Sequence, residues 1–324
     1  MLTTPSKLTR LRSAVLAAVA GAALLTAGTQ AARAEFINVL TGGTSGVYYP
    51  LGVALTKIYA ESIPDARPTA QATKASVENL NLLDSGKGEI AFTLGDSLGL
   101  AWAGDADAGF KKKLEGLRTV AAIYPNYIQV VASKESGIKT LADLKGKRVS
   151  VGAAKSGTEI NARAILGAAG LSYDDLGKVE YLPFAESVEL MKNRQLDATL
   201  QSAGLGVASI RDLASSVPIT VVEVPAADVE KIGLPYVAVT IPAGTYTGQD
   251  ADVSTAGVQN FLVTRADLSD DLVYAMTKSM FDHLDQMAAA HSAAKGITIE
   301  GASKDSPVPL HPGAERFYKE KGAM

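Results

Sequence analysis

From Glu35 to the C-terminus, segments with the pattern of β-strands alternate with segments that carry apolar residues at helical spacing. Apolar runs such as "EFINVL", "EIAFTL" and "RTVAAIY" predict strands, and residues 49–62 place Leu51, Leu55, Ile58 and Tyr59 on one helical face. Such alternation is typical of α/β folds with parallel sheets. The sequence therefore predicts two similar α/β halves.

The segment "YPNY" at residues 124–127 is the expected point where the chain leaves one sheet and enters another. Its Pro and Asn lie between two strong predicted strands. A single crossing would give two sequential domains. A second crossing near "EVPAADVEKIGLPYVAVTIPAG" would give a discontinuous first domain that the C-terminal helix closes.

Three local patterns predict helices. Residues 96–115 are expected to be helical, and Thr140 and Asp143 have the spacing of a capping box. Ser269 is expected to cap one long amphipathic helix. The buried stripe of that helix would contain Leu272, Met276, Met280, Leu284 and Met287.

Residues 1–34 have the pattern of a signal peptide. Three basic residues precede the apolar run "SAVLAAVAGAALLTAG", and "ARA" at residues 32–34 fits a cleavage site before Glu35. A transmembrane anchor is the alternative, but the run is rich in Ala and shorter than the roughly 20 strongly apolar residues that a span needs. We expect export to the periplasm with cleavage near Ala34 and Glu35, which leaves 324 − 34 = 290 residues.

Charge and composition exclude several functional classes. Removing Lys7, Arg10, Arg12 and Arg33 changes the formal net charge from −3 to −3 − 4 = −7. Nucleic-acid binding needs a clustered basic face, so we expect no nucleic-acid partner. The sequence has no Cys, which excludes disulfides, thiol catalysis, thiolate metal sites and a lipid-anchored Cys.

Five predicted strand-to-helix junctions share one chemistry. They are "TGGTSGVYYP", "ATKASVEN", "LGDS", "GAAKSGTEIN" and "QSAG", each rich in Gly, Ser, Thr or Asn. In open α/β sheets the carboxyl ends of the strands line the ligand crevice. Because helix starts there offer free N–H groups and a positive dipole end, the junctions favour a small anionic or zwitterionic ligand.

The first junction is a Gly-rich loop without a phosphate-binding fingerprint. "GGTSG" matches neither G-x-x-x-x-G-K-[ST] nor G-x-G-x-x-G. A tight turn without a ligand is the alternative, since turns use the same residues. Tyr48 and Tyr49 favour a pocket wall for an organic ligand.

Candidates for catalysis or metal binding are weak. His283, His291 and His311 all lie in the C-terminal part, and the first two are not spaced as a helical metal pair. No G-x-S-x-G elbow is present. Asp143 is best explained as a helix cap, whereas the sequence is consistent with two roles for Asp96, a helix cap or a ligand contact. We expect no enzyme, no metal and no cofactor.

Five segments, taken together and in order, resemble the TAXI family of TRAP-transporter solute receptors. They are "TGGTSGVYYPLG", "ATKASVENLNLLDSGKGEIAF", "ADLKGKRVSVGAAKSGTE", "TIPAGTYTGQDADV" and "PLHPGAERFYKEKG". The resemblance implies an α/β protein with the type II periplasmic binding protein fold, in which two lobes joined by a hinge close on a solute. The expected lobes are residues 35–125 with 246–324, and residues 126–245.

The resemblance also implies a ligand and a partner. The ligand would be a small carboxylate or amino acid such as glutamate or glutamine, and the partner a TRAP permease whose membrane subunits are usually fused and driven by an ion gradient. Many relatives have "GGTGGVYYP" at the first junction, so we expect the added hydroxyl of Ser45 to affect ligand choice. The implied ligand-binding residues are Thr44, Ser45, Gly46, Val47, Tyr48, Ser76, Val77, Asp96, Ser97, Ser156, Gly157, Thr158 and Asn161, with Tyr124, Gln201 and Gly204 as secondary contacts.

No arginine stands in a predicted crevice loop. Arg163 lies past the first turn of its helix, and Arg118 begins a strand. We therefore expect N–H groups and hydroxyls to bind the ligand, strengthened when lobe closure excludes water. Two alternatives stay open: a ligand-sensing partner of a membrane receptor, and an enzyme on the same fold.

Overall fold

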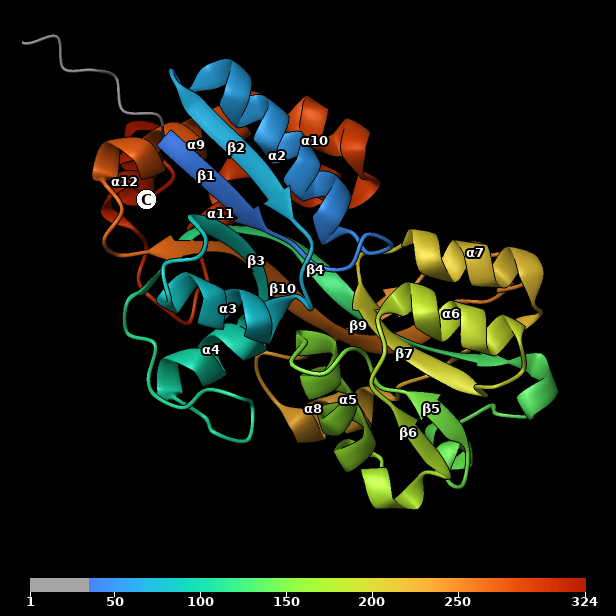
Figure 1. The fold of residues 1–324 in the computed structure, drawn as a ribbon. Coiled ribbons are helices and arrows are strands. Elements are labelled where there is room, and N and C mark those ends of the chain that lie inside the picture. The colour runs from blue at the N-terminus through green and yellow to red at the C-terminus, as the bar shows by residue number, and fades with distance from the viewer. Residues whose placement is uncertain (1–34) are drawn as a thin grey trace, which may run out of the picture. The chain divides into compact units, whose positions relative to one another are not determined.

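Figure 1 shows the computed structural model of the protein, which describes residues 35–324. The predicted signal peptide lies outside the described residues. Within residues 35–324, strands form one ten-stranded sheet in the order β2-β1-β3-β10-β4-β7-β5-β6, with β8 paired to β4 and β9 to β10. The predicted alternation of strands and helices is confirmed.

Three parallel strands at one end of the sheet define what we call the first lobe. Every residue of β3 is buried, as expected for a parallel strand covered on both faces. The helix after β1 buries the face predicted from the sequence, with Leu51, Leu55, Ile58 and Tyr59. The elements are β1 (Glu35–Leu40), α2 (Tyr48–Ser62), β2 (Ala66–Gln71), α3 (Ser76–Asp84), β3 (Ile90–Leu94) and α4 (Gly95–Ala103).

The helix predicted over residues 96–115 is shorter than expected. It ends at Ala103 because Gly104 adopts a left-handed conformation, with φ 74°, and caps it. The chain then reaches β4 through a loop.

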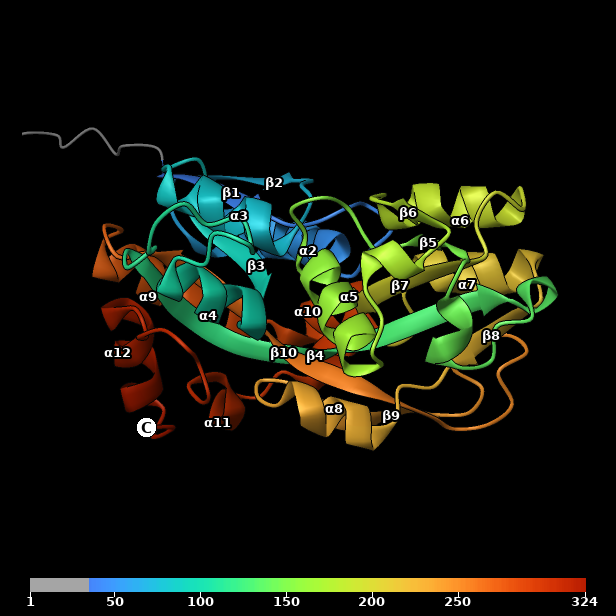
Figure 2. The ribbon, with the colours of Figure 1, turned by 90° about the horizontal axis from the view of Figure 1, so that it is seen from below.

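Two long antiparallel strands, β4 (Leu117–Ser133) and β10 (Val253–Arg265), run through both lobes (Figure 2). The prediction that "YPNY" separates two strands is wrong, because residues 124–127 lie inside β4. Pro125 faces Gln259 of β10, where the pairing shifts register before Phe261. Such an irregularity accommodates a residue that has no N–H to donate.

Parallel strands β5 and β6, with β7 beside β5, define the second lobe. The predicted capping box is confirmed, because Asp143 Oδ2 accepts from Thr140 N at 2.9 Å. The hydrogen bonds from Lys139 N and Thr140 N lower the Asp143 pKa. The elements are η1 (Lys134–Ser136), η2 (Leu141–Leu144), β5 (Arg148–Ser150), α5 (Gly157–Ala168), η3 (Tyr173–Asp175), β6 (Lys178–Glu180), α6 (Phe184–Lys192), β7 (Ala198–Ala203), α7 (Ala208–Ser216), β8 (Ile219–Val222), α8 (Ala226–Ile232) and β9 (Val237–Ile241).

The C-terminal segment packs on the first lobe, where α9 and α10 contact α2 and α12 packs on α9. Ser269 caps α9 as predicted, accepting from Leu272 N at 3.2 Å. The prediction of one long helix is wrong, because the helix is interrupted at His283, whose φ is −131°. The ring of His283 forms a hydrogen bond with Ser279 O. The elements are α9 (Asp270–Asp282), α10 (Leu284–Ala290), η4 (Ser292–Gly296), α11 (Ile299–Ala302) and α12 (Pro312–Glu320).

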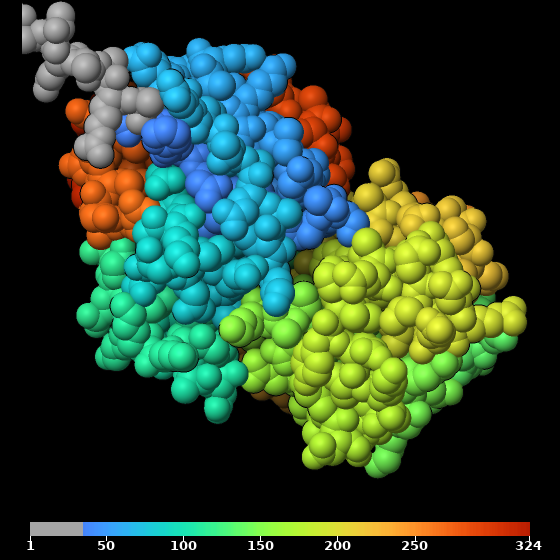
Figure 3. Space-filling view, viewed as in Figure 1, coloured from blue at the N-terminus to red at the C-terminus, as the bar shows by residue number. Residues whose placement is uncertain are grey.

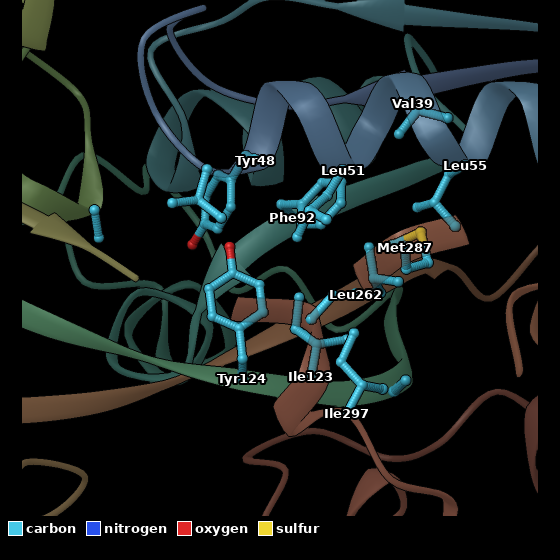
Figure 4. Packing of buried hydrophobic residues seen from close by; sticks show 14 of the residues in the cluster. Val39, Tyr48, Leu51, Leu55, Phe92, Ile123, Tyr124, Leu262, Met287 and Ile297 are labelled. Carbon is cyan, nitrogen blue, oxygen red and sulfur yellow. The ribbon is translucent and has the colours of Figure 1, made fainter. Parts of the chain in front are cut away.

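The largest hydrophobic cluster covers the first-lobe strands and extends under α6 and α7 of the second lobe. It packs Val39 and Phe92 against Leu55 of α2, Leu262 of β10 and Met287 of α10 (Figure 4). A second cluster fills the second lobe. The lobe boundaries predicted at residues 125 and 245 stay a prediction, since β4 and β10 pass between the lobes.

Candidate functional site

A cavity of about 110 Å³ lies where helix starts from both lobes meet. The first lobe contributes the segments before α2 and α3, and the second lobe contributes the start of α5. In Figure 3 the blue and cyan surface of the first lobe meets the green and yellow surface of the second along a furrow. Each lobe thus supplies part of the cavity wall.

The β1–α2 loop supplies Gly42, Gly43, Gly46, Val47 and Tyr48 to the cavity wall. Gly46 N donates to Gly43 O at 3.0 Å, which closes a tight turn before the helix. The Tyr48 ring stacks on Phe92 at 5.0 Å, and its hydroxyl donates to Asn260 Oδ1. Burial raises the pKa of Tyr48. This side chain is held from both sides and presents a fixed surface.

The β2–α3 junction supplies Thr73, Lys74, Ala75 and Ser76. Ala75 has φ 70° and ψ −145°, a conformation that residues with a side chain rarely adopt. Its N–H donates to Thr73 Oγ1 at 3.0 Å, which helps to hold the turn. Ser76 Oγ accepts from Leu94 N at 3.1 Å. The strained turn places the first N–H groups of α3 beside the cavity.

The start of α5 supplies Ser156, Gly157 and Thr158 from the second lobe. Ser156 caps the helix, accepting from Glu159 N at 3.1 Å. A side chain at Gly157 would meet Ser76 Oγ at 2.6 Å and Leu94 Cδ1 at 2.7 Å, both in the first lobe. Glycine is therefore required here for the two lobes to approach this closely.

Asp96 lies outside this cavity wall, in a buried cluster that joins the lobes. Its Oδ2 accepts from Asn161 Nδ2 of α5 at 2.6 Å and from the Tyr236 hydroxyl at 2.6 Å, and its Oδ1 accepts from Ser97 N at 2.5 Å. Burial raises the pKa of Asp96, although these hydrogen bonds act in the opposite direction. The carboxylate is thus occupied by protein donors.

The other predicted contacts also lie outside the cavity wall. Thr44 is exposed and Ser45 half-buried on the first loop, whereas Val77 packs in the first-lobe core. Gln201 accepts from Ser209 Oγ at 2.6 Å, and Gly204 lies near Ala293 and Tyr124.

Tyr124 lies behind the cavity wall. Its hydroxyl is buried, has no hydrogen-bond partner among residues 35–324, and points toward that of Tyr48 (Figure 4). Arg163 bonds Asp107 O and Arg118 bonds Glu115 O, so neither arginine lines the cavity.

Several lining residues were not named among the predicted contacts, although all except Asn126, Pro183 and Phe184 lie in the five predicted junctions. Asn126 Nδ2 donates to Ser202 O at 2.9 Å, and Asn126 Oδ1 accepts from Asn260 Nδ2 at 2.7 Å, so this amide is fixed at the base of the wall. Asn126 was interpreted as part of a domain crossing. The other lining residues that were not named are Gly42, Gly43, Thr73, Lys74, Ala75, Leu94, Ala153, Pro183, Phe184, Ser202 and Ala203.

No group of His, Cys, Asp and Glu in residues 35–324 could hold a metal ion. No helix in the same residues is long and apolar enough to cross a membrane.

The arrangement is similar to solved structures that share little sequence with this chain. A protein from Bordetella bronchiseptica RB50 has a TM-score of 0.55 and 17% identity, covering 90% of this chain and 98% of that one. A protein described as a periplasmic transporter has a TM-score of 0.54 and 12% identity, with 90% and 95% covered. A binding-protein component of an ABC phosphonate transporter from Pseudomonas aeruginosa has a TM-score of 0.51 and 11% identity, with 82% and 81% covered.

These likenesses establish the fold, which is the two-lobe, mixed α/β fold of type II periplasmic binding proteins. A sequence profile of the NMT1-like family matches residues 39–322, and the chain therefore belongs to the NMT1-like family.

Proposed function

We propose that the protein is an extracytoplasmic solute-binding receptor that captures a small carboxylate or amino acid between its lobes and delivers it to a membrane permease. The observation that carries this proposal is the convergence of the N-termini of α2, α3 and α5 on one cavity. Helix starts present free N–H groups and a positive dipole end, which bind anions without a basic side chain.

Contacts between the lobes support a closing mechanism. Glu78 N of α3 donates to Lys155 O at 3.1 Å, and Arg163 Nη1 of α5 donates to Asp107 O at 3.1 Å. Together with the Asp96 cluster, these bonds hold the lobes against each other around the cavity. A closed cavity excludes water and strengthens each hydrogen bond to a ligand, so a ligand that binds both lobes would favour the closed form.

The permease partner has two candidates. The resemblance to the TAXI family favours a TRAP permease driven by an ion gradient. The similarity in fold to a binding-protein component of an ABC phosphonate transporter favours an ATP-driven permease instead. We propose the TRAP partner, because five separated sequence segments support it. Transport by the receptor with each permease in proteoliposomes, driven by sodium or by ATP, separates the two.

A thermal-shift screen of small carboxylates and amino acids tests ligand binding. At a ligand concentration about 100 times its Kd, binding adds about 2.7 kcal/mol to the free energy of unfolding, so we expect Tm to rise by about 5 °C. An analogue in which the carboxylate is replaced by hydrogen is the control and should leave Tm unchanged. Equal stabilisation by both compounds would contradict anion capture.

A further inference from the structure

The cavity wall lacks a group that would pair with an ammonium ion. Among the described residues that line it, Lys74 is the one charged side chain, and it is exposed at the edge. An amino acid buried here would bring its ammonium group beside positive helix ends without a carboxylate partner. A buried charge without a partner is strongly unfavourable.

The acidic side chains at the starts of the neighbouring helices are already occupied. Glu78 Oε2 accepts from Lys74 N at 2.6 Å, and Glu159 pairs with Arg163 at 2.9 Å. The Asp96 carboxylate accepts hydrogen bonds from Ser97 N, Asn161 and Tyr236. None of these three carboxylates lines the cavity.

One side chain in the wall has an unused hydrogen-bonding group. Thr158 is 6% exposed and lines the cavity. A Cβ added at Gly152 would meet its methyl carbon Cγ2 at 2.6 Å, so the methyl group packs against Gly152 of the same lobe. Its hydroxyl makes no hydrogen bond within residues 35–324, and unlike the hydroxyl of Thr199 it is not sealed inside the protein. This hydroxyl, beside the first N–H groups of α5, is a donor for an oxyanion.

The size and apolar character of the wall limit the rest of the ligand. Leu94, Val47, Phe184, Ala153 and Ala203 form apolar parts of the wall around a volume of about 110 Å³. A cavity of about 150 Å³ holds one benzene molecule. This cavity is smaller but partly open, so it suits a ligand of about that size or less.

Resting on the proposed function, we infer that the ligand is a small monoanionic acid with a short apolar tail and no ammonium group. The oxyanion binds at the helix starts with the Thr158 hydroxyl, and the tail packs on Leu94 and Phe184. A carboxylate and a sulfonate share this chemistry, and matched probes distinguish them.

Calorimetric titration with matched pairs tests the inference. The carboxylate pair is 2-oxobutanoate and 2-aminobutanoate, and the sulfonate pair is ethanesulfonate and 2-aminoethanesulfonate. We expect the acid without nitrogen to bind at least tenfold more tightly than its amino counterpart in one pair or both. Equal or tighter binding of the amino compounds, or of glutamate over all four, would overturn the inference and leave the proposed receptor function standing. Binding of none of these five compounds would overturn the inference, whereas the proposed function falls only if the wider thermal-shift screen is also negative.

A pair of variants places the ligand in this cavity. Thr158→Val removes the unused hydroxyl and should weaken binding of the preferred acid about tenfold with an unchanged apo Tm. Thr199→Val removes a buried hydroxyl that also lacks a partner but lies outside the cavity, and should leave affinity within twofold. If Thr158→Val binds the acid like the parent protein, the oxyanion is not held here and the inference is wrong.

Discussion

Two sets of strand-to-helix junctions look alike in sequence and differ in the structure. The junctions before α2, α3 and α5 line the cavity, with small residues and free helix-start N–H groups. The junctions after β3 and β7 add only Leu94, Ser202 and Ala203 to the wall. Their longer polar side chains turn inward, where Asp96 binds Asn161 and Tyr236, and Gln201 binds Ser209. The two sets differ in whether side chains from other parts of the chain form hydrogen bonds with the polar groups of the junction.

The comparison predicts separate effects for the two sets. Variants at the cavity junctions should change ligand affinity more than apo stability. Variants at the inward junctions should change stability first, and affinity only through lobe closure.

Asp96→Ala has the largest expected effect. The change removes the carboxylate that accepts from the Asn161 amide and leaves the buried Tyr236 hydroxyl without an acceptor, so the free energy of unfolding should fall by about 3 kcal/mol. Urea unfolding of the apo protein measures it. Tyr236→Phe removes one of these donors and should lower the free energy by about 1 kcal/mol. An unchanged free energy of unfolding in Asp96→Ala would show that the cluster does not hold the lobes together.

Gly157→Ala should reduce affinity, because the added methyl group opposes closure of the lobes. The added methyl group would meet Ser76 Oγ at 2.6 Å and Leu94 Cδ1 at 2.7 Å when the lobes are closed. Overpacking of this kind is unfavourable by about 2 kcal/mol, which is about a 30-fold weaker Kd by calorimetry. Gly167→Ala, in the same helix with nothing within 4 Å, is the matched control and should bind like the parent protein. Parental binding by Gly157→Ala would contradict closure at this point.

Asp96 should also make the free energy of unfolding depend on pH, with a smaller effect than the two substitutions above. Burial raises its pKa in the folded protein above the unfolded value of about 3.9. The folded state therefore binds the proton more readily, and this stabilisation is fully present below about pH 3.9 and lost as the pH rises through the folded pKa. We expect the wild type to gain stability relative to Asp96→Asn, by about 1 kcal/mol, as the pH falls from 7 toward 4. A difference that does not change with pH would mean that the folded pKa is not raised.

The sequence predicted what local patterns determine. The buried face of α2, the Ser269 cap and the Thr140–Asp143 capping box depend on residues a few positions apart. The break at His283 was missed, because apolar spacing continues through it toward Met287.

The contacts of a junction depend on residues far away in the sequence, so they could not be predicted from local patterns. Asp96 and Tyr236 are 140 positions apart, and no local pattern near "LGDS" indicates that pairing. Asn126 reaches the cavity because β4 continues from one lobe into the other, and Phe184 reaches it from the start of α6. Gly and Ser at a strand end indicate a helix start, but the partners across the lobes decide what it binds.

The most direct test of the account is a crystal structure of the protein with the acid that binds most tightly. The account predicts electron density for the acid between the lobes, with its oxygens about 2.7 to 3.2 Å from helix-start N–H groups of α3 or α5 and from the Thr158 hydroxyl. An acid bound elsewhere on the protein, with this cavity holding only water, would contradict it.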